Sequence, residues 1–241
     1  MPSELKPGSP SYVILQGGDW TATIRQTLPI MPRVMVSLRP TWILPTIAAI
    51  EPDFLSLAGI RTLIWDVDGT LTHHHSCALA PEATVAFRKL LAVEGLQHVI
   101  ASNCGESRFR ELAAVFPGVP VVKAYRTSKG LVSRIRIDDV ETWSGAPEGQ
   151  LTPLRKPDPQ FIREAVLALG VTDFASVAMV GDQHLTDIAA ANLAGIRSIK
   201  VPTSGPASRP LMVRLLQEID AALYLLMKRV SARPGDTDFQ P

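Results

Sequence analysis

Two carboxylates stand one residue apart where an apolar run of the sequence ends. Residues 63–65 are apolar, and Asp66, Asp68, Gly69 and Thr70 follow within five positions. The run predicts a buried strand, and the Gly-Thr pair predicts the turn after it. An aspartate at the end of a buried strand needs a charge partner or a metal ion to compensate for its lost hydration. The pair therefore indicates a site, with a simple acidic turn as the structural alternative.

The chemistry that this pair offers is nucleophilic attack by one carboxylate and proton transfer by the other. A divalent cation would offset the repulsion between Asp66 and Asp68 and leave Asp66 able to attack an electrophile such as phosphorus. The turn at Gly69 can rotate the second side chain, so that Asp68 presents its backbone carbonyl to a cation instead.

Ser102 and Asn103 follow the next predicted strand, residues 97–102, at the start of a helix that begins near Glu106. A hydroxyl, an amide and free backbone N–H groups at a helix N-terminus favour an anion such as phosphate. The alternative is an ordinary N-cap.

Two later segments add a cation and two more carboxylates. Lys156 precedes a helix predicted from about 158 to 169, where its ammonium can meet a phosphate or a carboxylate nucleophile. A predicted strand over 176–180 leads into Asp182, and Asp187 falls about one turn into the next helix. Both aspartates could reach a cation near Asp66. The alternative for Lys156 is a surface lysine at a proline-bounded turn.

The order of these elements predicts an α/β fold with a doubly wound parallel sheet. Strands alternate with helices, and the polar groups follow strand ends or precede helices. In such sheets ligands bind outside the carboxyl ends of the strands, so all four segments should meet at one edge. The predicted strands after the first cover residues 97–102, 119–123, 176–180 and 196–201.

Composition narrows the class of protein. The 241 residues are 46% hydrophobic and 20% charged, with a formal net charge of +1, so bulk charge gives no indication of a nucleic-acid partner. Two cysteines, Cys77 and Cys104, cannot build a disulfide framework and fit a reducing cytoplasm. The start of the chain lacks the pattern of a signal peptide, and no apolar run reaches the ~20 residues that span a bilayer.

The expected organisation is a partly mobile lead over residues 1–30, a single domain over 31–230 with an excursion at 124–155, and a disordered tail over 231–241. Residues 31–60 are expected to pack on the sheet, with a membrane-surface segment as the alternative. A last helix over 208–229 is expected to dock through a line of apolar residues. That line is Leu211, Leu215, Ile219, Leu223 and Leu226 or Met227. The tract His73–His75 predicts a polar loop beside the site, with a transition-metal site as the alternative.

The ordered set Asp-Val-Asp-Gly-Thr, Ser102, Lys156-Pro157 and Gly-Asp-Gln-x-x-x-Asp resembles the four motifs of the haloacid dehalogenase (HAD) superfamily. The resemblance implies a Rossmann-like core and a phosphatase in which Asp66 is the nucleophile and Asp68 the acid/base. It implies Mg²⁺ held by Asp66, the Asp68 carbonyl and Asp182, with Asp187 as a helper. It further implies a phosphate site at Ser102, Asn103, Gly69 and Thr70, and a Lys156 that steadies the nucleophile.

Within that superfamily the chain resembles subfamily IIIA and its YqeG-like branch, which includes phosphatidylglycerophosphate phosphatases. The resemblance runs from about residue 34 to 229, with departures at Gly69, where the branch usually has Asn, and at 124–155. It implies little or no cap domain, a phospholipid head group as substrate and a cytoplasmic protein, with peripheral membrane contact left open. The alternatives are a phosphatase of small metabolites and a non-catalytic phosphate-binding scaffold. Oligomeric state and the true substrate are not predicted.

Overall fold

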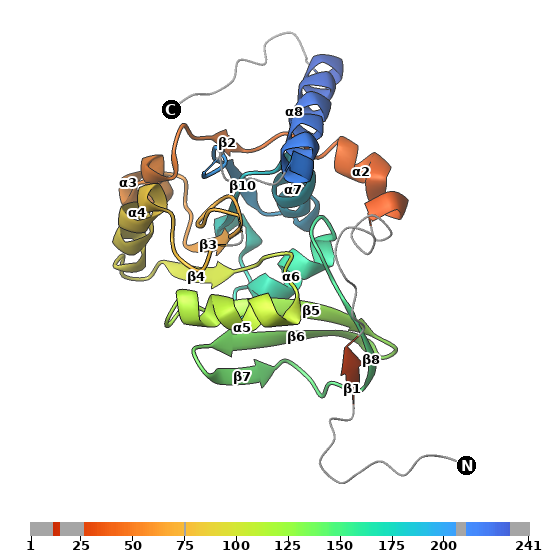
Figure 1. The fold of residues 1–241 in the computed structure, drawn as a ribbon. Helices are drawn as coiled ribbons and strands as arrows, with labels where there is room; N and C mark the ends of the chain where they lie inside the picture. The colour runs from red at the N-terminus through yellow and green to blue at the C-terminus, as the bar shows by residue number, and fades with distance from the viewer. Residues whose placement is uncertain (1–11, 15–26, 75, 206–210, 232–241) are drawn as a thin grey trace, which may run out of the picture.

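The computed structural model describes residues 12–14, 27–74, 76–205 and 211–231 (Figure 1). The predicted tail, apart from Ser231, and most of the predicted lead lie outside this part of the chain, as does His75. Within the lead, β1 (Tyr12–Ile14) is a strand that pairs in parallel with β8 (Gly149–Pro153).

The described strands form one sheet in the order β1-β8-β5-β4-β3-β9-β10-β2, with β6 and β7 continuing beside β5. The remaining strands are β2 (Trp42–Ile43), β3 (Thr62–Trp65), β4 (Gln97–Ile100), β5 (Val121–Thr127), β6 (Gly130–Ile137), β7 (Val140–Trp143), β9 (Val177–Gly181) and β10 (Arg197–Lys200). The predicted α/β fold is confirmed. The sheet is mixed rather than wholly parallel, because β6, β7 and β8 join it in antiparallel pairings.

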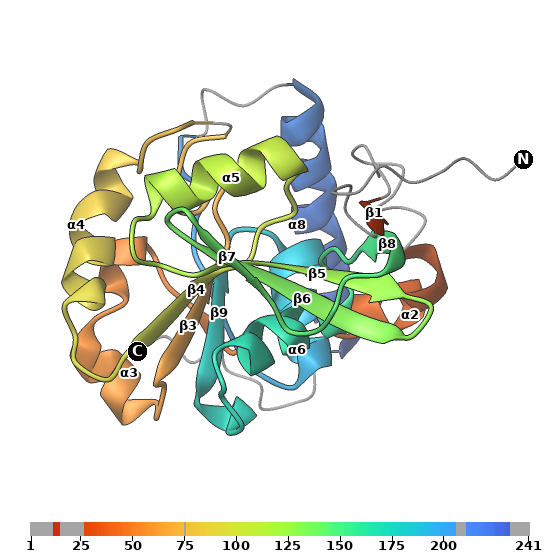
Figure 2. The ribbon, with the colours of Figure 1, turned by 90° about the horizontal axis from the view of Figure 1, so that it is seen from below.

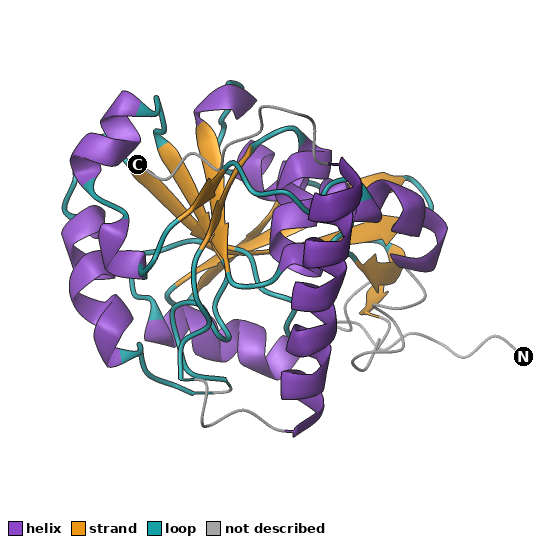
Figure 3. Ribbon diagram, turned by 90° about the horizontal axis from the view of Figure 1, so that it is seen from above, coloured by secondary structure: helices purple, strands orange, loops and turns teal. Residues whose placement is uncertain are grey.

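Helices cover both faces of the central parallel strands, as Figures 2 and 3 show. They are α2 (Met31–Met35), α3 (Pro52–Leu57), α4 (Pro81–Leu91), α5 (Glu106–Val115), α6 (Pro159–Ala168), α7 (Ala189–Ala194) and α8 (Leu211–Ser231), with short 3₁₀ turns at Leu28–Ile30, Ile47–Ala49 and Phe174–Ser176 and a π-helical turn at His184–Ile188.

Alternation along the strands explains the two layers. In β3, Leu63 and Trp65 pack in the core cluster that includes α4 and α5 residues, while Ile64 packs in the cluster that includes α6 and α7 residues. Successive strand side chains point to opposite faces, so a strand buried on both faces is apolar throughout. This burial holds β3, β4 and β9 rigidly and fixes where their carboxyl ends lie.

The segment 124–155 extends the sheet instead of leaving it. Strands β5 and β6 form a long hairpin, β7 pairs with β6, and β8 returns to β5. In Figure 1 these strands lie at the end of the molecule opposite α8.

The two flanking segments differ from each other. In 31–60, Val34, Leu38, Leu44, Ile47 and Ile50 are buried, as the packing prediction required. The predicted docking line of α8 is correct in part: Leu223 and Met227 pack on the core together with Tyr224, whereas Leu215, Ile219 and Leu226 are exposed. The side chain of Leu211 lies outside the described part of the structure. None of the described helices is long and apolar enough to cross a membrane.

Candidate active site

The site lies where β3 and β9 end. Asp66 directly follows β3, and its backbone N–H donates to the Val180 carbonyl of β9 at 3.0 Å. Asp182 directly follows β9, and Asp187 lies in the π-helical turn that comes next. Parallel pairing of β3 with β9 therefore brings these three predicted carboxylates together, and their oxygens lie within 4.8 Å of one another.

Lys156 joins two of the carboxylates. Its Nζ lies 2.5 Å from Asp66 Oδ1 and 2.8 Å from Asp187 Oδ1, and all three side chains are buried. The Asn103 side chain fixes the lysine backbone, because Asn103 Oδ1 accepts from Lys156 N at 2.8 Å and Nδ2 donates to Lys156 O at 2.9 Å. Both polar atoms of the Asn103 side chain, which was expected at the phosphate, thus bind the backbone of Lys156.

Two glycines permit the close approach of these groups. Gly69 has φ +97°, and a Cβ there would lie 2.9 Å from Asp182 Oδ2. A Cβ on Gly181 would lie 2.3 Å from Asp187 Cβ, so any side chain at that position would displace the carboxylate. The glycine where the resembled branch has Asn therefore fits tightly against Asp182.

Thr70 lies within hydrogen-bonding distance of two of the carboxylates. Its hydroxyl lies 3.2 Å from Asp66 Oδ2 and 3.4 Å from Asp182 Oδ1. Ser102 is buried in the loop between β4 and α5, beside Asn103, where the prediction placed a phosphate-binding hydroxyl.

Negative charge exceeds positive charge in this cluster. Burial raises the pKa of Asp66 to about 8. The charge of Lys156 opposes this rise, and the charges of Asp187 and Asp182 add to it. Burial and Asp187 likewise raise the pKa of Asp182 to about 6. Burial opposes the charge on Lys156, but Asp187 and Asp66 outweigh it and raise the pKa of the ammonium. A single ammonium thus leaves three buried carboxylates short of positive charge.

This donor set fits a hard divalent cation. Magnesium is bound through one or two carboxylates with water or phosphate oxygens completing the shell. A cation among Asp66, Asp182 and Asp187 would supply the missing charge, lower the carboxylate pKa values and keep Asp66 ionised at neutral pH. His73 lies apart from the group of possible ligands found among the described residues, with its Nε2 3.5 Å from Glu82.

Asp68 has a partner that the sequence reasoning missed. Its Oδ1 accepts from Arg108 of α5 at 2.9 Å and from the Thr72 hydroxyl at 3.4 Å. Arg108 is the third residue of α5, directly after the Ser102–Gly105 loop. Its place in the first turn of that helix could have indicated a contact with the site.

Helix α8 also reaches the site. Gln217 Nε2 donates to Asp182 Oδ2 at 3.1 Å, and Thr203 donates to the same oxygen at 2.7 Å. Asp220 accepts from the backbone N–H groups of His184 and Leu185 at 2.9 and 2.6 Å, which caps the turn that carries Asp187. Nothing near these positions in the sequence marks them as partners of residues 182–187.

Comparison with known proteins gives one family match. Residues 153–218, which include Lys156, Asp182 and Asp187, match a family model described as HAD-hydrolase-like. No curated protein matches the chain. A crystal structure of an uncharacterized protein from Listeria monocytogenes serotype 4b is similar, with 21% identity, 70% of this chain and 99% of that chain covered, and a TM-score of 0.39. A second solved structure has 16% identity, covers 72% of this chain and 86% of its own, and has a TM-score of 0.44.

The family match and the carboxylate cluster agree on one chemistry. The matched segment supplies the ammonium and two of the three buried carboxylates, and β3 supplies the third from outside it. The molecule therefore has a HAD-like α/β core with a HAD-hydrolase-like domain segment over 153–218, and it is a phosphatase-type hydrolase.

Proposed function

We propose that this protein is a Mg²⁺-dependent phosphomonoester hydrolase that works through an aspartyl-phosphate on Asp66 and dephosphorylates phosphatidylglycerophosphate. The observation that carries the hydrolase assignment is the buried Lys156 ammonium between Asp66 and Asp187, with Asp182 beside them. Asp66, Asp182 and Asp187 would hold the cation, with the backbone carbonyl of Asp68 as a further ligand. The cation would neutralise charge on the phosphoryl oxygens.

The residues divide the reaction between them. Asp66 attacks phosphorus, the bond from phosphorus to the leaving oxygen breaks, and Asp68 gives that oxygen its proton. Asp68 then removes a proton from water, which attacks phosphorus and breaks the bond to Asp66. Inorganic phosphate and the free carboxylate result. Ser102 and the N–H groups of the loop before α5 bind phosphoryl oxygens, and Lys156 balances the charge of the nucleophile.

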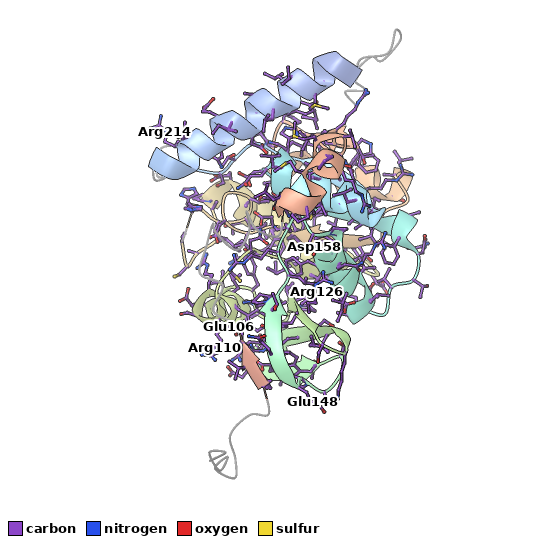
Figure 4. The ribbon with its side chains drawn as sticks, turned by 90° about the vertical axis from the view of Figure 1, so that its right-hand side faces the viewer. Glu106, Arg110, Arg126, Glu148, Asp158 and Arg214 are labelled. Atoms are coloured by element: carbon purple, nitrogen blue, oxygen red, sulfur yellow. The ribbon has the colours of Figure 1, made fainter. Side chains whose placement is uncertain are left out.

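The lipid substrate is supported by α8. One face of this helix contacts the site through Gln217 and Asp220, while Leu215, Leu225 and Leu226 on other positions are each 54% exposed. Figure 4 shows α8 lying along one side of the molecule with Arg214 near its end. An amphipathic helix with apolar and basic residues suits a membrane surface, and this one would bring the site to a lipid head group.

A substrate panel tests both parts of the proposal. Purified protein with Mg²⁺ is given phosphatidylglycerophosphate in mixed micelles, glycerol phosphate, sugar phosphates, nucleotides and an aryl phosphate, and phosphate release is measured. We expect the highest kcat/KM for the lipid. A preference for a soluble metabolite would overturn the lipid assignment and support the small-metabolite alternative. Absence of all hydrolysis would overturn the enzyme mechanism and favour the phosphate-binding scaffold.

The surface of α8 supplies a variant that separates chemistry from membrane contact. Leu226→Glu should lower hydrolysis of the lipid in vesicles and leave hydrolysis of the aryl phosphate unchanged. Leu57→Glu is the matched control, because Leu57 is 90% exposed on α3. Equal lipid activity in all three proteins would refute a role for α8 at the membrane.

A further inference from the structure

Arg108 connects the acid/base aspartate to the loop that follows it. The same nitrogen of Arg108 donates to Asp68 Oδ1 at 2.9 Å and to the Ser76 carbonyl at 2.7 Å. Asp68 follows β3, Ser76 belongs to the loop before α4, and Arg108 comes from α5. One guanidinium thus ties three separate segments together beside the carboxylate cluster.

The contact is largely withdrawn from water. The side chain of Arg108 is 11% exposed and that of Asp68 is 17% exposed. Burying a guanidinium is costly unless hydrogen bonds compensate, and Arg108 Nε is buried with no hydrogen-bond partner among the described residues. The exposed Glu111, at 3.4 Å, offers a longer contact one turn along the same helix. The hydrogen bonds to Asp68 and Ser76 therefore determine where the guanidinium lies, although its Nε is left without a hydrogen-bond partner in the described part of the chain.

A proton-transfer group acts well only when its geometry is held. An aspartate side chain rotates freely unless its carboxylate is bound, and a displacement of about 1 Å at a reacting group costs about 100-fold in rate. One nitrogen of Arg108 contacts Asp68, and the second hydrogen bond of that nitrogen, to the Ser76 carbonyl, fixes where it lies. Thr72 supports Asp68 with a hydrogen bond of 3.4 Å, so Arg108 is the shorter of these two contacts.

We propose that Arg108 is a positioning residue that orients Asp68 for proton transfer to the leaving group. This inference rests on the proposed function, in which Asp68 is the acid/base. It predicts a dependence on the leaving group. A basic alkoxide requires the proton from Asp68 in order to depart, whereas a weakly basic phenoxide does not.

The test compares two substrates in five proteins. The value of kcat/KM is measured for an alkyl phosphate and for 2,4-dinitrophenyl phosphate with the wild type, Arg108→Met, Arg108→Lys and Asp68→Asn. Arg110→Met is the matched control, because Arg110 is exposed on the same helix and is labelled in Figure 4. The ratio of the two values does not depend on the fraction of protein that is folded.

We expect Arg108→Met to lose about 100-fold on the alkyl phosphate and less than about threefold on the dinitrophenyl phosphate. Arg108→Lys should recover part of the loss, and Arg110→Met should match the wild type. An Arg108→Met protein that loses both activities equally, or neither, would overturn the positioning role while leaving the hydrolase intact. A wild type that hydrolyses neither substrate, or an unchanged ratio in Asp68→Asn, would overturn the proposed mechanism and this inference with it.

Discussion

Two clusters of charged side chains lie in the interior, and they differ in balance. The first has Lys156 with Asp66, Asp182 and Asp187, one cation against three carboxylates. The second joins α5 to the hairpin and has Lys123 and Arg134 with Glu106 and Glu141, two cations against two carboxylates, and Arg136 adds a third cation 3.5 Å from Glu141. Both contain buried ions held by several partners. Only the first is left short of positive charge.

The difference in charge balance distinguishes a candidate site from a structural cluster of ion pairs. In the second cluster burial opposes ionisation, but Lys123 and Arg134 outweigh it and hold the pKa of Glu106 below its usual range. Every charge there has a partner, and Arg134 also lies over the rings of Phe109 and Trp143. In the first cluster the pKa of Asp66 is raised instead. A carboxylate whose ionisation is disfavoured in the folded protein marks a place built for an additional charge.

The largest expected effect comes from removing the nucleophile. Asp66→Asn should lower kcat for phosphomonoester hydrolysis by at least about 10³-fold, because loss of a covalent nucleophile removes a whole reaction path. The measurement is phosphate release under single-turnover conditions, and Asp53→Asn on the exposed face of α3 is the control. Unchanged hydrolysis in Asp66→Asn would show that the unbalanced cluster is not the catalytic one.

The balanced cluster should respond in stability. Arg134→Met leaves Glu106 with Lys123 alone and Glu141 with only the 3.5 Å contact to Arg136, and breaking a buried ion pair on one side costs about 3 kcal/mol. Chemical denaturation should show this loss in the free energy of unfolding, with kcat of the folded fraction little changed. Arg136→Met on the same strand, whose ion pairs are 3.5 Å long, should cost less than about 1 kcal/mol. Equal losses of unfolding free energy in the two variants would show that the buried ion pairs of Arg134 stabilise the fold no more than the longer pairs of Arg136 do.

Sequence reasoning located the first cluster through two of its members that follow strands. Asp66 and Asp182 each end an apolar run with a glycine nearby, and parallel pairing then determines that the two ends meet. Lys156 is predicted by a different signal, its place just before a predicted helix. The roles predicted for Ser102, Gly69 and Thr70 at the phosphate stay predictions, and Thr70 is seen bonded to the carboxylates.

The long-range contacts of the site could not be predicted from the sequence, for a physical reason. The partners of Asp68 and Asp182 come from α5 and α8, 40 and 35 residues away, and no local pattern encodes such pairings. For α8 the apolar periodicity predicted the contacts of Leu223 and Met227 but not those of the first half of the helix. The helix presents Gln217 and Asp220 to the core, because the buried backbone N–H groups of residues 184 and 185 and the carboxylate of Asp182 need hydrogen-bond partners there. In the first half of the helix, hydrogen bonding to buried polar groups therefore determines which side faces the core, and Leu215 and Ile219 stay exposed.

Adding the missing charge should stabilise the protein. A cation that binds the folded state alone adds about 2.7 kcal/mol at 100 times its Kd, so Mg²⁺ should raise Tm and EDTA should reverse the rise. In Asp182→Asn the rise should be much smaller, while Glu141→Gln should keep the full rise from a lower starting Tm. A rise of the same size in Asp182→Asn would place the binding site outside the carboxylate cluster.

The two clusters should finally differ in how stability depends on pH, measured without Mg²⁺. Asp66 has a raised pKa of about 8, so between about pH 4 and 8 the folded state keeps a proton that the unfolded state releases, and stability falls as pH rises. Glu106 has a lowered pKa, so its contribution is present above the unfolded value near 4.5 and is lost as pH falls. Relative to the wild type, Asp66→Asn should therefore gain stability with rising pH, by at most about 1.4 kcal/mol per pH unit. Glu106→Gln should lose relative stability as pH rises through the region near 4.5, and unfolding curves at pH 4, 6 and 8 measure both. If both variants follow the wild type in parallel, the difference in charge balance has no energetic consequence.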